Sequence, residues 1–350
     1  MKKIFLFFLV LFPFCVKAIS ASSYIVMDAD SGRVLEGSNI SSQRLIASIS
    51  KIMTAIVAIE NGDVESVVKV DDSILKSYGS GIYIQVGEEL TLDDLLYGLM
   101  LRSGNDAALS IAKSVSGDIS SFVYLMNQKA IEIGMVNTVF LNPSGLEESN
   151  GEGNMSTVYD MALLMRYAMT NEHFRRITGT KDIVVKSSYK TYKWSNKNKL
   201  LLSYEHCTGG KTGYTEKARR TLVTSASYDD MKLIVVTFND GNDFNDHKSL
   251  YEKYFGKYDV KNVLKKGDSL EENVYVKNDF NLIVKDDDVV ETKVIMDKID
   301  KPFNGEIVGR VNVILNGEEI GYRYLYYKKE LVSVDKSFWS KLVDFLKFWE

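Results

Sequence analysis

Residue types that build disulfides and metal sites are scarce in this sequence. Its 350 residues include two cysteines, Cys15 and Cys207, and three histidines, His173, His206 and His247. The histidines are scattered and do not indicate a metal site. Cys15 falls in an N-terminal segment that we expect to be removed, so Cys207 has no partner for an intramolecular disulfide. We therefore expect Cys207 to be a small apolar filler.

The sequence also has no concentrated basic patch. Its formal net charge is −4, and acidic and basic residues are mixed along the chain. Nucleic-acid binding normally needs clustered positive charge, so we predict no nucleic-acid partner. The content of 45% hydrophobic and 26% charged residues is that of an ordinary globular protein, and the length is enough for two domains.

The apolar run Ile4–Val16 is too short for a comfortable transmembrane span, which needs about 20 residues. Two lysines precede it, and the small residues Ala18 and Ser20 follow it. This pattern is typical of a signal peptide over residues 1–20, with cleavage after Ser20. The alternative is an uncleaved anchor helix. We expect an exported protein.

The central part of the chain predicts a mixture of helices and strands. Helical periodicity and cap signals predict helices at 48–61, on both sides of a break at 103–105 within 91–116, at 119–134 and at 157–169. Strand patterns predict a hairpin at 24–36 and strands at 221–228 and 232–238. We expect an α+β catalytic domain over residues 22–257, with an antiparallel sheet that pairs the hairpin with the late strands.

The pattern changes after about Tyr258. Short strand-like runs separated by Asp, Asn, Gly and Lys turns predict a small all-β domain over residues 258–332. Residues 335–350 form an amphipathic helical pattern with several aromatic residues on its apolar side. Such a short helix suits the outer face of the cytoplasmic membrane, since terminal aromatics left exposed favour aggregation. The alternative is a helix packed on the β domain.

Two short motifs place hydroxyl, amine and amide groups in the helical part. Ser48 and Lys51 are three residues apart, so on a helix they share a face. A neutral lysine can take the proton that makes a serine hydroxyl nucleophilic, if burial and nearby positive charge lower the lysine pKa. Ser103 and Asn105 lie in the break between two helices, where they can relay a proton and hold a peptide bond. Each motif alone is weak, because turns use the same residues.

The third motif, Lys211-Thr212-Gly213, leads into the late β pattern. A strand of this composition lets a peptide lie along its edge, with Lys211 and Thr212 available for a terminal carboxylate. The three motifs follow one another about 55 and then 108 residues apart. In this order they form the set of the β-lactamases and penicillin-binding proteins.

The likeness extends along nearly the whole chain after the signal segment. The sequence resembles the low-molecular-mass penicillin-binding proteins, which are the D-alanyl-D-alanine carboxypeptidases of serine peptidase family S11. The similar segments are IVMDADSGRVL, IASISKIMTA, LMLRSGNDAA, MNQKAIEIGMVNTVFLNPSGL, STVYDMALLMRYAM, GGKTGYTEKA and KPFNGEIVGRVNV. The resemblance implies a β-lactamase/transpeptidase-like fold, no metal or other cofactor, peptidoglycan pentapeptide as substrate and acylation by β-lactam antibiotics.

The resemblance also implies catalytic roles. Ser48 is the acyl-ester nucleophile, Lys51 the general base and Ser103 a proton relay. Backbone N–H groups of Ser48 and Tyr214 form the oxyanion hole, a feature usually worth a few kcal/mol.

The resemblance implies that four further residues bind the substrate. Asn105 positions the substrate or the base, while Lys211 and Thr212, next to Gly213, bind the terminal carboxylate. Many relatives carry an additional arginine for that carboxylate, but residues 240–246 contain none. Our hypothesis is that Arg220 supplies this charge; the alternative is a solvated arginine at the strand edge.

Other functions remain open at this level. A β-lactamase would use a loop glutamate with an asparagine companion, and Glu147, Glu148 and Glu152 do not form such a pattern. We expect these three acids to be solvated. A D,D-endopeptidase or transpeptidase would use the same motifs. A non-catalytic penicillin-binding wall protein is the third alternative, although its motifs would have no reason to be intact.

Overall fold

The structure is a computed structural model, and it describes residues 19–329. Contacts divide the chain into two compact units. The first contains the chain up to Val26 together with Leu35–Ser227 and Leu233–Lys253, and the second contains Met27–Val34, Tyr228–Lys232 and the chain from Tyr254 onward. The domain boundary at 257/258 stays a prediction. Nearly all of the predicted signal peptide, and the whole predicted helix 335–350, lie outside the described residues.

A five-stranded sheet forms the base of the first unit, with strand order β2-β1-β11-β10-β9. Its strands are β1 (Ser23–Asp28), β2 (Val34–Ser38), β9 (Cys207–Thr215), β10 (Arg219–Tyr228) and β11 (Met231–Phe238). The N-terminal hairpin therefore pairs with the late strands, as predicted. Strand β9 is the last in this order, so one of its edges has no neighbouring strand among residues 19–329, and such an edge can pair with an extended peptide.

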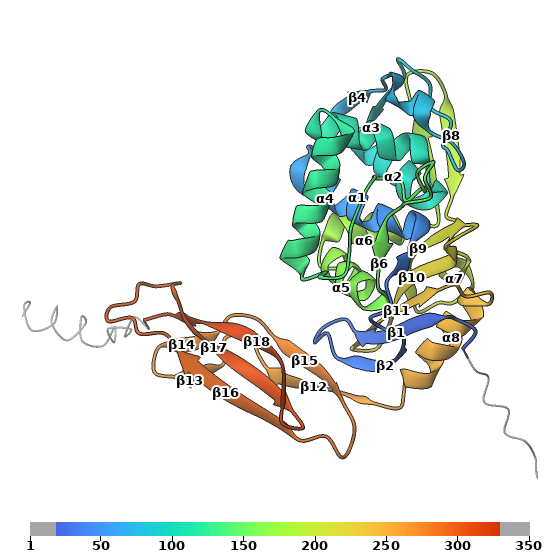
Figure 1. The fold of residues 1–350 in the computed structure, drawn as a ribbon. Helices are drawn as coiled ribbons and strands as arrows, with labels where there is room; N and C mark the ends of the chain where they lie inside the picture. Colours follow the sequence, from blue (N-terminus) through green and yellow to red (C-terminus); the bar gives the residue numbers. More distant parts are fainter. Residues whose placement is uncertain (1–18, 330–350) are drawn as a thin grey trace, which may run out of the picture. The chain divides into compact units, whose positions relative to one another are not determined.

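Helices lie on both faces of this sheet (Figure 1). They are α1 (Lys51–Asn61), α2 (Leu92–Arg102), α3 (Asn105–Ser116), α4 (Ile119–Ile133), α5 (Val158–Ala168), α6 (Glu172–Thr178), α7 (Lys199–Ser203) and α8 (Asp243–Tyr254). The β10 threonines show the two sides: Thr221 donates to the carbonyl of Ile46, just before α1, whereas Thr224 contacts His247 and Tyr251 of α8. None of the helices within residues 19–329 has the length and apolar character needed to cross a membrane.

The nucleophile segment differs from the prediction. The α-helix begins at Lys51, and Ser48 lies in the preceding 3-10 turn η1 (Ala47–Ser50). Ala47 adopts a left-handed conformation with φ of 51°, and the Ser50 hydroxyl donates to the Ala47 carbonyl at 2.7 Å. A non-glycine residue rarely adopts this conformation, so the surrounding structure must hold it. The predicted helix start at Ser48 is therefore wrong by three residues.

The break at the second motif is confirmed. Thr91 starts α2 with a capping box completed by Asp94, and α2 ends at Ser103, whose φ of 63° is left-handed. Gly104 then caps α3. A left-handed residue ends helical hydrogen bonding, so the two helices diverge and the Ser103–Asn105 turn lies between them.

Several small elements surround this framework and were not predicted from the sequence. They are the turn η2 (Asp72–Lys76) and the strand pairs β3 (Arg44–Leu45) with β6 (Met155–Ser156), β4 (Val67–Lys69) with β5 (Glu89–Thr91), and β7 (Asp182–Lys186) with β8 (Thr191–Ser195). Helices α6 to α8 were also not predicted. Strands β3 to β6, with two or three residues each, are too short to give a clear periodic signal.

The second unit is built from strands, as predicted. One sheet pairs β12 (Asp259–Leu264) with β15 (Phe280–Val284). The other has the order β13-β14-β18-β17-β16, formed by β13 (Ser269–Glu271), β14 (Val274–Val276), β16 (Val290–Met296), β17 (Ile307–Leu315) and β18 (Glu318–Tyr327). Alternate apolar residues of these strands share one core, which includes Val276, Phe280, Leu282, Val311, Val313 and Leu325. Strands β12 and β13 were missed by the sequence analysis.

Candidate active site

The amine of Lys51 is buried at the start of α1 and contacts three oxygen atoms. Lys51 Nζ lies 3.0 Å from Ser48 Oγ and 2.8 Å from Asn105 Oδ1. It also donates to the backbone carbonyl of Ser144. The first two predicted motifs are therefore brought together at one nitrogen atom.

The geometry suits a neutral amine at Lys51. A neutral amine has two hydrogens and one lone pair, whereas an ammonium ion has three hydrogens and no lone pair. The Asn105 side-chain oxygen and the Ser144 carbonyl are acceptors, so together they use both hydrogens. The third contact is the Ser48 hydroxyl, which can donate its own hydrogen to the lone pair.

Electrostatics favour the same protonation state. Burial lowers the pKa of Lys51 well below its ordinary value, and the positive charges of Lys211 and Lys197 lower it further. The negative charge of Asp106 acts in the opposite direction. Burial disfavours an ammonium ion because the ion loses its hydration. Lys51 therefore has the pKa shift expected of a general base.

The second motif is held by the loop before it. Asn105 donates from Nδ2 to the carbonyl of Tyr78 at 2.6 Å, which fixes the amide so that its oxygen faces Lys51. The buried carboxylate of Asp106 accepts hydrogen bonds from the backbone N–H groups of Ile82 and Tyr83, at 3.0 and 2.7 Å. Residues 78–83 thus position Asn105 and Asp106. The sequence analysis did not assign this loop a role.

The third motif lies on the edge strand β9 and packs directly against the nucleophile turn. A Cβ atom on Gly213 would lie 3.0 Å from the backbone nitrogen of Ser48 and 2.4 Å from Thr221 Oγ1. Only glycine leaves room for this approach. Lys211 on the same strand is buried, donates to the Thr212 carbonyl at 2.7 Å and has its pKa lowered to about 7, mainly by burial and then by Lys197.

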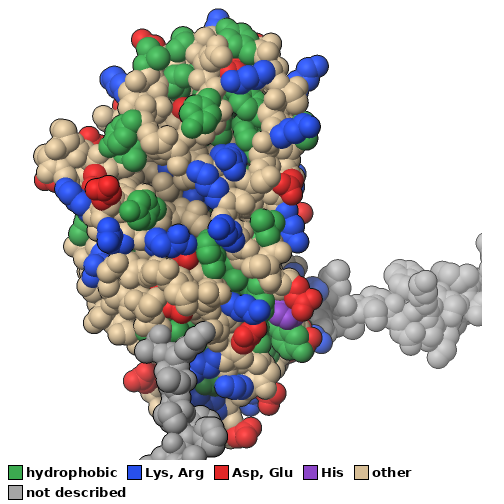
Figure 2. Space-filling view, turned by 90° about the vertical axis from the view of Figure 1, so that its right-hand side faces the viewer, with side chains coloured by type: hydrophobic (Ala, Val, Ile, Leu, Met, Phe, Trp, Pro, Cys, Tyr) green, Lys and Arg blue, Asp and Glu red, His purple; other side chains and the backbone are tan. Residues whose placement is uncertain are grey.

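A cleft of about 360 Å³ joins the three motifs. It is lined by Ser48, Ser80, Ser103, Lys197, Lys199, Thr212, Gly213, Tyr214, Arg220, Asp243 and Phe244. Figure 2 shows basic side chains near the middle of one face of the first unit. A positively charged, hydroxyl-lined cleft beside a free strand edge suits an extended peptide that ends in a carboxylate.

Two participants escaped the sequence analysis. Ser144 acts through its backbone carbonyl, and Lys197 reaches the cleft from the segment after β8, where its amine donates to Ser80 Oγ at 3.1 Å. Burial, followed by the charge of Arg102, lowers the pKa of Lys197. A backbone acceptor has no residue-type signal, and Lys197 belongs to no motif.

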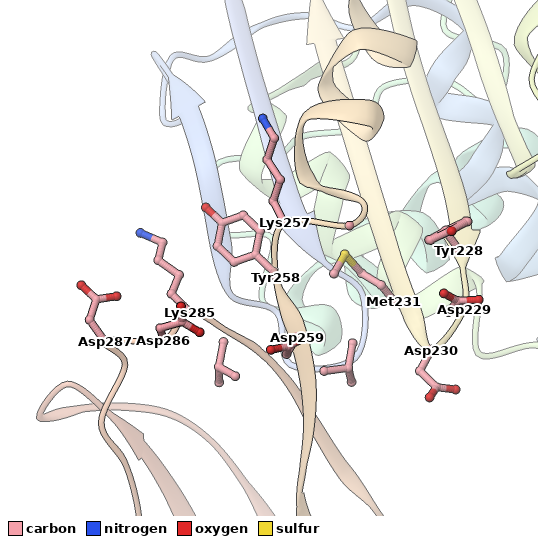
Figure 3. Close-up of a pocket in the computed structure, with 13 residues that line it drawn as sticks. Tyr228, Asp229, Asp230, Met231, Lys257, Tyr258, Asp259, Lys285, Asp286 and Asp287 are labelled. Atoms are coloured by element: carbon pink, nitrogen blue, oxygen red, sulfur yellow. The ribbon is translucent and has the colours of Figure 1, made fainter.

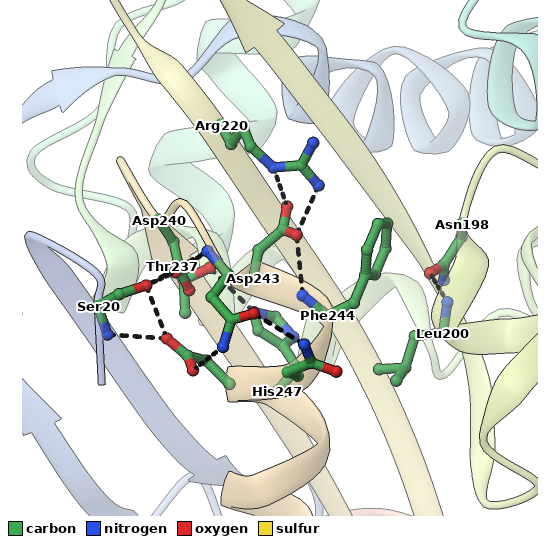
Figure 4. Close-up of polar contacts among 12 residues, drawn as sticks. Ser20, Asn198, Leu200, Arg220, Thr237, Asp240, Asp243, Phe244 and His247 are labelled. Atoms are coloured by element: carbon green, nitrogen blue, oxygen red, sulfur yellow. Dashed lines mark hydrogen bonds and ion pairs between the residues drawn. The ribbon is translucent and has the colours of Figure 1, made fainter. Parts of the chain in front are cut away.

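Arg220 reaches the cleft, but its charge already has a partner. Its guanidinium donates to both carboxylate oxygens of buried Asp243, at 3.1 and 2.6 Å, and lies 5.5 Å from the centre of the Phe244 ring (Figure 4). Arg220 is opposite Tyr214 in the β9–β10 pairing. Its role in carboxylate binding stays a prediction.

The remaining sequence expectations have mixed outcomes. Cys207 is buried, and burial raises the pKa of its thiol to about 11, so it is an unreactive filler as expected. Glu148 and Glu152 are exposed. The expectation for Glu147 is wrong, because its half-buried carboxylate accepts a hydrogen bond from Thr215. Among the described residues, no group of His, Cys, Asp or Glu side chains could hold a metal ion.

A second, larger cavity of about 770 Å³ lies in the second unit and lacks this chemistry (Figure 3). Its polar lining consists mainly of Asp229, Asp230, Asp259, Asp286 and Asp287, with Lys257 and Lys285. None of its lining residues is a serine, a histidine or a cysteine that could act as a nucleophile or its base. The candidate active site is therefore the smaller cleft.

The close approach at Gly213 leads to a first prediction. In Gly213→Ala, the added methyl group pushes β9 away from Ser48, so acylation by a labelled penicillin should slow about 100-fold or more, the scale of a lost oxyanion-hole donor. Gly241→Ala is the matched control, because a Cβ at Gly241 meets no atom within 4 Å. Equal acylation rates for the two variants would contradict the assigned constraint.

The pKa shift at Lys51 leads to a second prediction. Lys197→Met removes a positive charge that lowers the Lys51 pKa, so that pKa should rise. The base is neutral only above its pKa, and the acidic limb of the kcat/KM profile should therefore move to higher pH, by on the order of 0.5 unit. Lys193→Met, at an exposed position of β8, should leave the limb in place. An unchanged limb in Lys197→Met would show that this charge does not tune the base.

Comparisons with known proteins identify the family of this chain. Residues 13–242 match the sequence profile of the D-alanyl-D-alanine carboxypeptidase family, peptidase S11. The chain is 36% identical over 228 residues to D-alanyl-D-alanine carboxypeptidase DacF of Bacillus subtilis. The aligned region covers 63% of this chain and 58% of that protein. It is also 36% identical over 216 residues to DacB2 of Mycobacterium tuberculosis, covering 61% of this chain and 73% of that protein.

Solved structures of penicillin-binding proteins and D-alanyl-D-alanine carboxypeptidases have a similar fold. Penicillin-binding protein 5 from Haemophilus influenzae aligns with a TM-score of 0.73 at 25% identity, over 89% of this chain and 98% of that one. A D-alanyl-D-alanine carboxypeptidase from Mycobacterium tuberculosis aligns with a TM-score of 0.64 at 32% identity, over 67% of this chain and 90% of that one. These similarities confirm the transpeptidase-like fold, and this chain belongs to the D-alanyl-D-alanine carboxypeptidase family of serine peptidases.

Proposed function

We propose that this chain removes the terminal D-alanine from peptidoglycan stem peptides that end in D-alanyl-D-alanine, through an acyl-enzyme on Ser48. The observation that carries the proposal is the buried Lys51 amine, whose pKa is lowered by burial and by Lys211, and which lies 3.0 Å from Oγ of the cleft-lining Ser48. The family and the two curated relatives named above support the same activity.

In the acylation step, Lys51 takes the hydroxyl proton while Ser48 Oγ attacks the carbonyl carbon between the two D-alanines. The negative charge that forms on the carbonyl oxygen is stabilised by the backbone N–H groups of Ser48 and Tyr214. The packing of Gly213 on the Ser48 backbone supports this assignment, because it places the start of the nucleophile turn against β9. Preorganised N–H donors need no rearrangement when the charge develops.

The C–N bond then breaks, and the departing amine of D-alanine needs a proton. We assign this step to the hydroxyl of Ser103, which would pass on the proton that Lys51 accepted; the assignment is supported by the position of Ser103, which is buried, lines the cleft and follows directly on α2. Water subsequently attacks the ester carbonyl, with Lys51 again as base. This attack releases the shortened peptide and restores the Ser48 hydroxyl.

The terminal carboxylate is assigned to the β9 side of the cleft. Burial lowers the pKa of Lys211 to about 7, and a bound carboxylate would favour its charged form. Thr212 supplies a hydroxyl beside it, and Arg220 adds a guanidinium held in place by Asp243. Asn105 positions Lys51 through its side-chain oxygen.

Penicillins present a strained β-lactam amide in place of the peptide bond that Ser48 attacks, and we propose that they acylate this residue. A β-lactamase would in addition need a group that activates water for rapid deacylation. No glutamate is among the residues that line the cleft, and Glu147 is engaged with Thr215. This arrangement favours a stable acyl-enzyme.

We further propose that the protein is exported and held on the outer face of the cytoplasmic membrane. The support is the signal-peptide pattern of residues 1–20 and the amphipathic pattern of residues 335–350, in which Phe338, Trp339, Leu342, Phe345, Leu346 and Trp349 form one apolar stripe.

The central test is the release of free D-alanine from a diacyl-L-Lys-D-Ala-D-Ala peptide. The wild-type chain should release it, and Ser48→Ala should reduce the rate by at least about 10⁴-fold, since the covalent route is lost. Ser110→Ala, which removes a buried hydroxyl of α3 outside the cleft, is the control and should retain the rate. Stable labelling by penicillin without peptide hydrolysis would instead support a non-catalytic wall protein, and rapid nitrocefin turnover would support a β-lactamase.

The role of Arg220 is tested with a matched pair of variants. Arg220→Gln should lower kcat/KM for the peptide about 10-fold, and the loss should disappear on a substrate whose terminal carboxylate is amidated, because the guanidinium acts on that charge. Arg219→Gln changes the neighbouring arginine, which is exposed and does not line the cleft, and should retain the wild-type value. If Arg220→Gln also behaves as wild type, the arginine has no part in substrate binding.

A further inference from the structure

Two buried carboxylates converge on the first described residues of the chain. The backbone N–H of Ser20 donates to Asp246 Oδ2 at 2.8 Å, and its hydroxyl donates to Asp246 Oδ2 at 2.9 Å and to Asp240 Oδ1 (Figure 4). Asp240 is 1% exposed and Asp246 is 6% exposed. Ser20 is thus bound into the fold and is not merely a spacer in front of β1.

These two acids lack a positive partner in the described part of the chain. Neither forms an ion pair there, although nine other acidic residues do, including Asp243 with Arg220. Asp240 Oδ2 is buried and has no hydrogen-bond partner among residues 19–329. The Thr237 hydroxyl faces this carboxyl group and acts to lower its pKa, and it also lies 3.1 Å from Nε2 of His247.

Paired buried carboxylates without a cation are costly, because each loses hydration and repels the other. Burial, and then the charge of Asp246, raise the pKa of Asp240. A single positive charge near Ser20 would compensate both groups. The residue before Ser20 is Ile19, and consecutive Cα atoms are about 3.8 Å apart. An amino group at Ile19 would therefore lie near the carboxylates of Asp240 and Asp246, which bind Ser20.

We propose that the mature chain begins at Ile19 and that its α-ammonium group is the counter-ion of Asp240 and Asp246. The cleavage after Ser20 predicted from the sequence would delete the residue that both carboxylates bind. Cleavage after Ala18 keeps Ser20 and still places a small residue before the broken bond. This inference rests on the proposed export, but not on the proposed catalytic activity.

The ion pair would also act on the cleft. Asp240 Oδ1 accepts from the backbone N–H of Asn242 at 3.0 Å, and Asp246 Oδ1 accepts from Asn242 Nδ2 at 3.0 Å. The next residue is Asp243, which holds the guanidinium of Arg220. The mature amino terminus therefore binds the segment 240–246, which positions a cleft-lining arginine. This contact forms only after the signal peptide has been removed.

The first measurement is the amino-terminal sequence of the protein exported from a bacterial host through its own leader. The expected first residue is Ile19. A chain that starts at Ala21, or one that keeps its leader, would overturn the proposal.

The second measurement separates the charge effect from crowding. One chain starts at Ile19, released from a fusion by a protease that leaves no extra residue, and a second carries Gly-Ser-Gly before Ile19. The extension moves the ammonium group away and should lower the Tm by on the order of 3–6 °C. The loss should shrink when both chains carry Asp246→Asn, because only Asp240 then remains as a partner, but it should persist in full with Asp182→Asn, an exposed acid on β7.

An equal loss of Tm in the Asp246→Asn pair would show that the extension only crowds the site. If no pair shows a loss, the proposed ion pair does not exist. Labelling of Ser48 by penicillin in each chain reports the catalytic proposal separately. A failed Tm test with intact labelling would leave that proposal standing.

Discussion

The burial of one amine, that of Lys51, governs the arrangement of the catalytic unit. A lysine removed from water must lose its charge or gain compensating partners. Here the acceptors are Asn105 Oδ1 and the Ser144 carbonyl, which suit the two hydrogens of a neutral amine, and the Ser48 hydroxyl occupies the third direction. The nearby Lys211 disfavours reprotonation. The pKa of the base is therefore a property of three separate chain segments that meet at one nitrogen.

These segments meet because the backbone is allowed to approach closely. Gly213 brings β9 against the Ser48 turn, and on the opposite side Gly145, with φ of 82°, lies where a Cβ would be 2.0 Å from the Ala47 carbonyl. Left-handed Ala47 and Ser103 direct the two motif turns into the same space. Such conformations cost about 1–3 kcal/mol each and persist only when the surrounding packing holds them, which the buried core of α1 and α2 provides.

The sequence predicted the parts of the protein whose signals are local. The spacing of Ser48 and Lys51, the turn residues around Gly104 and the alternation in β10 and β11 each show in a short window, and the structure contains the corresponding elements. Helix α1 was predicted to begin three residues early, because the periodicity of its apolar residues does not distinguish an α-helix from a 3-10 turn at its first residues.

The parts that were missed depend on contacts between distant segments. Ser144 contributes a carbonyl group, which any residue type could supply, and Lys197 gains its role only from its position beside the cleft. The alternation that predicted β10 also gave no sign that Arg220 would pair with Asp243, 23 residues further along the chain.

The segment 240–246 shows why that last contact matters. Where an arginine of the relatives was expected, this chain places acids, and one of them orients an arginine from the neighbouring strand. The arginine at the cleft thus comes from β10, and the segment holds it in place. The carboxylates of Asp240, Asp243 and Asp246 repel one another unless positive charges lie at both ends of the segment. Arg220 is the cation at the cleft end, and a positive charge beside Ser20 would complete the arrangement at the other.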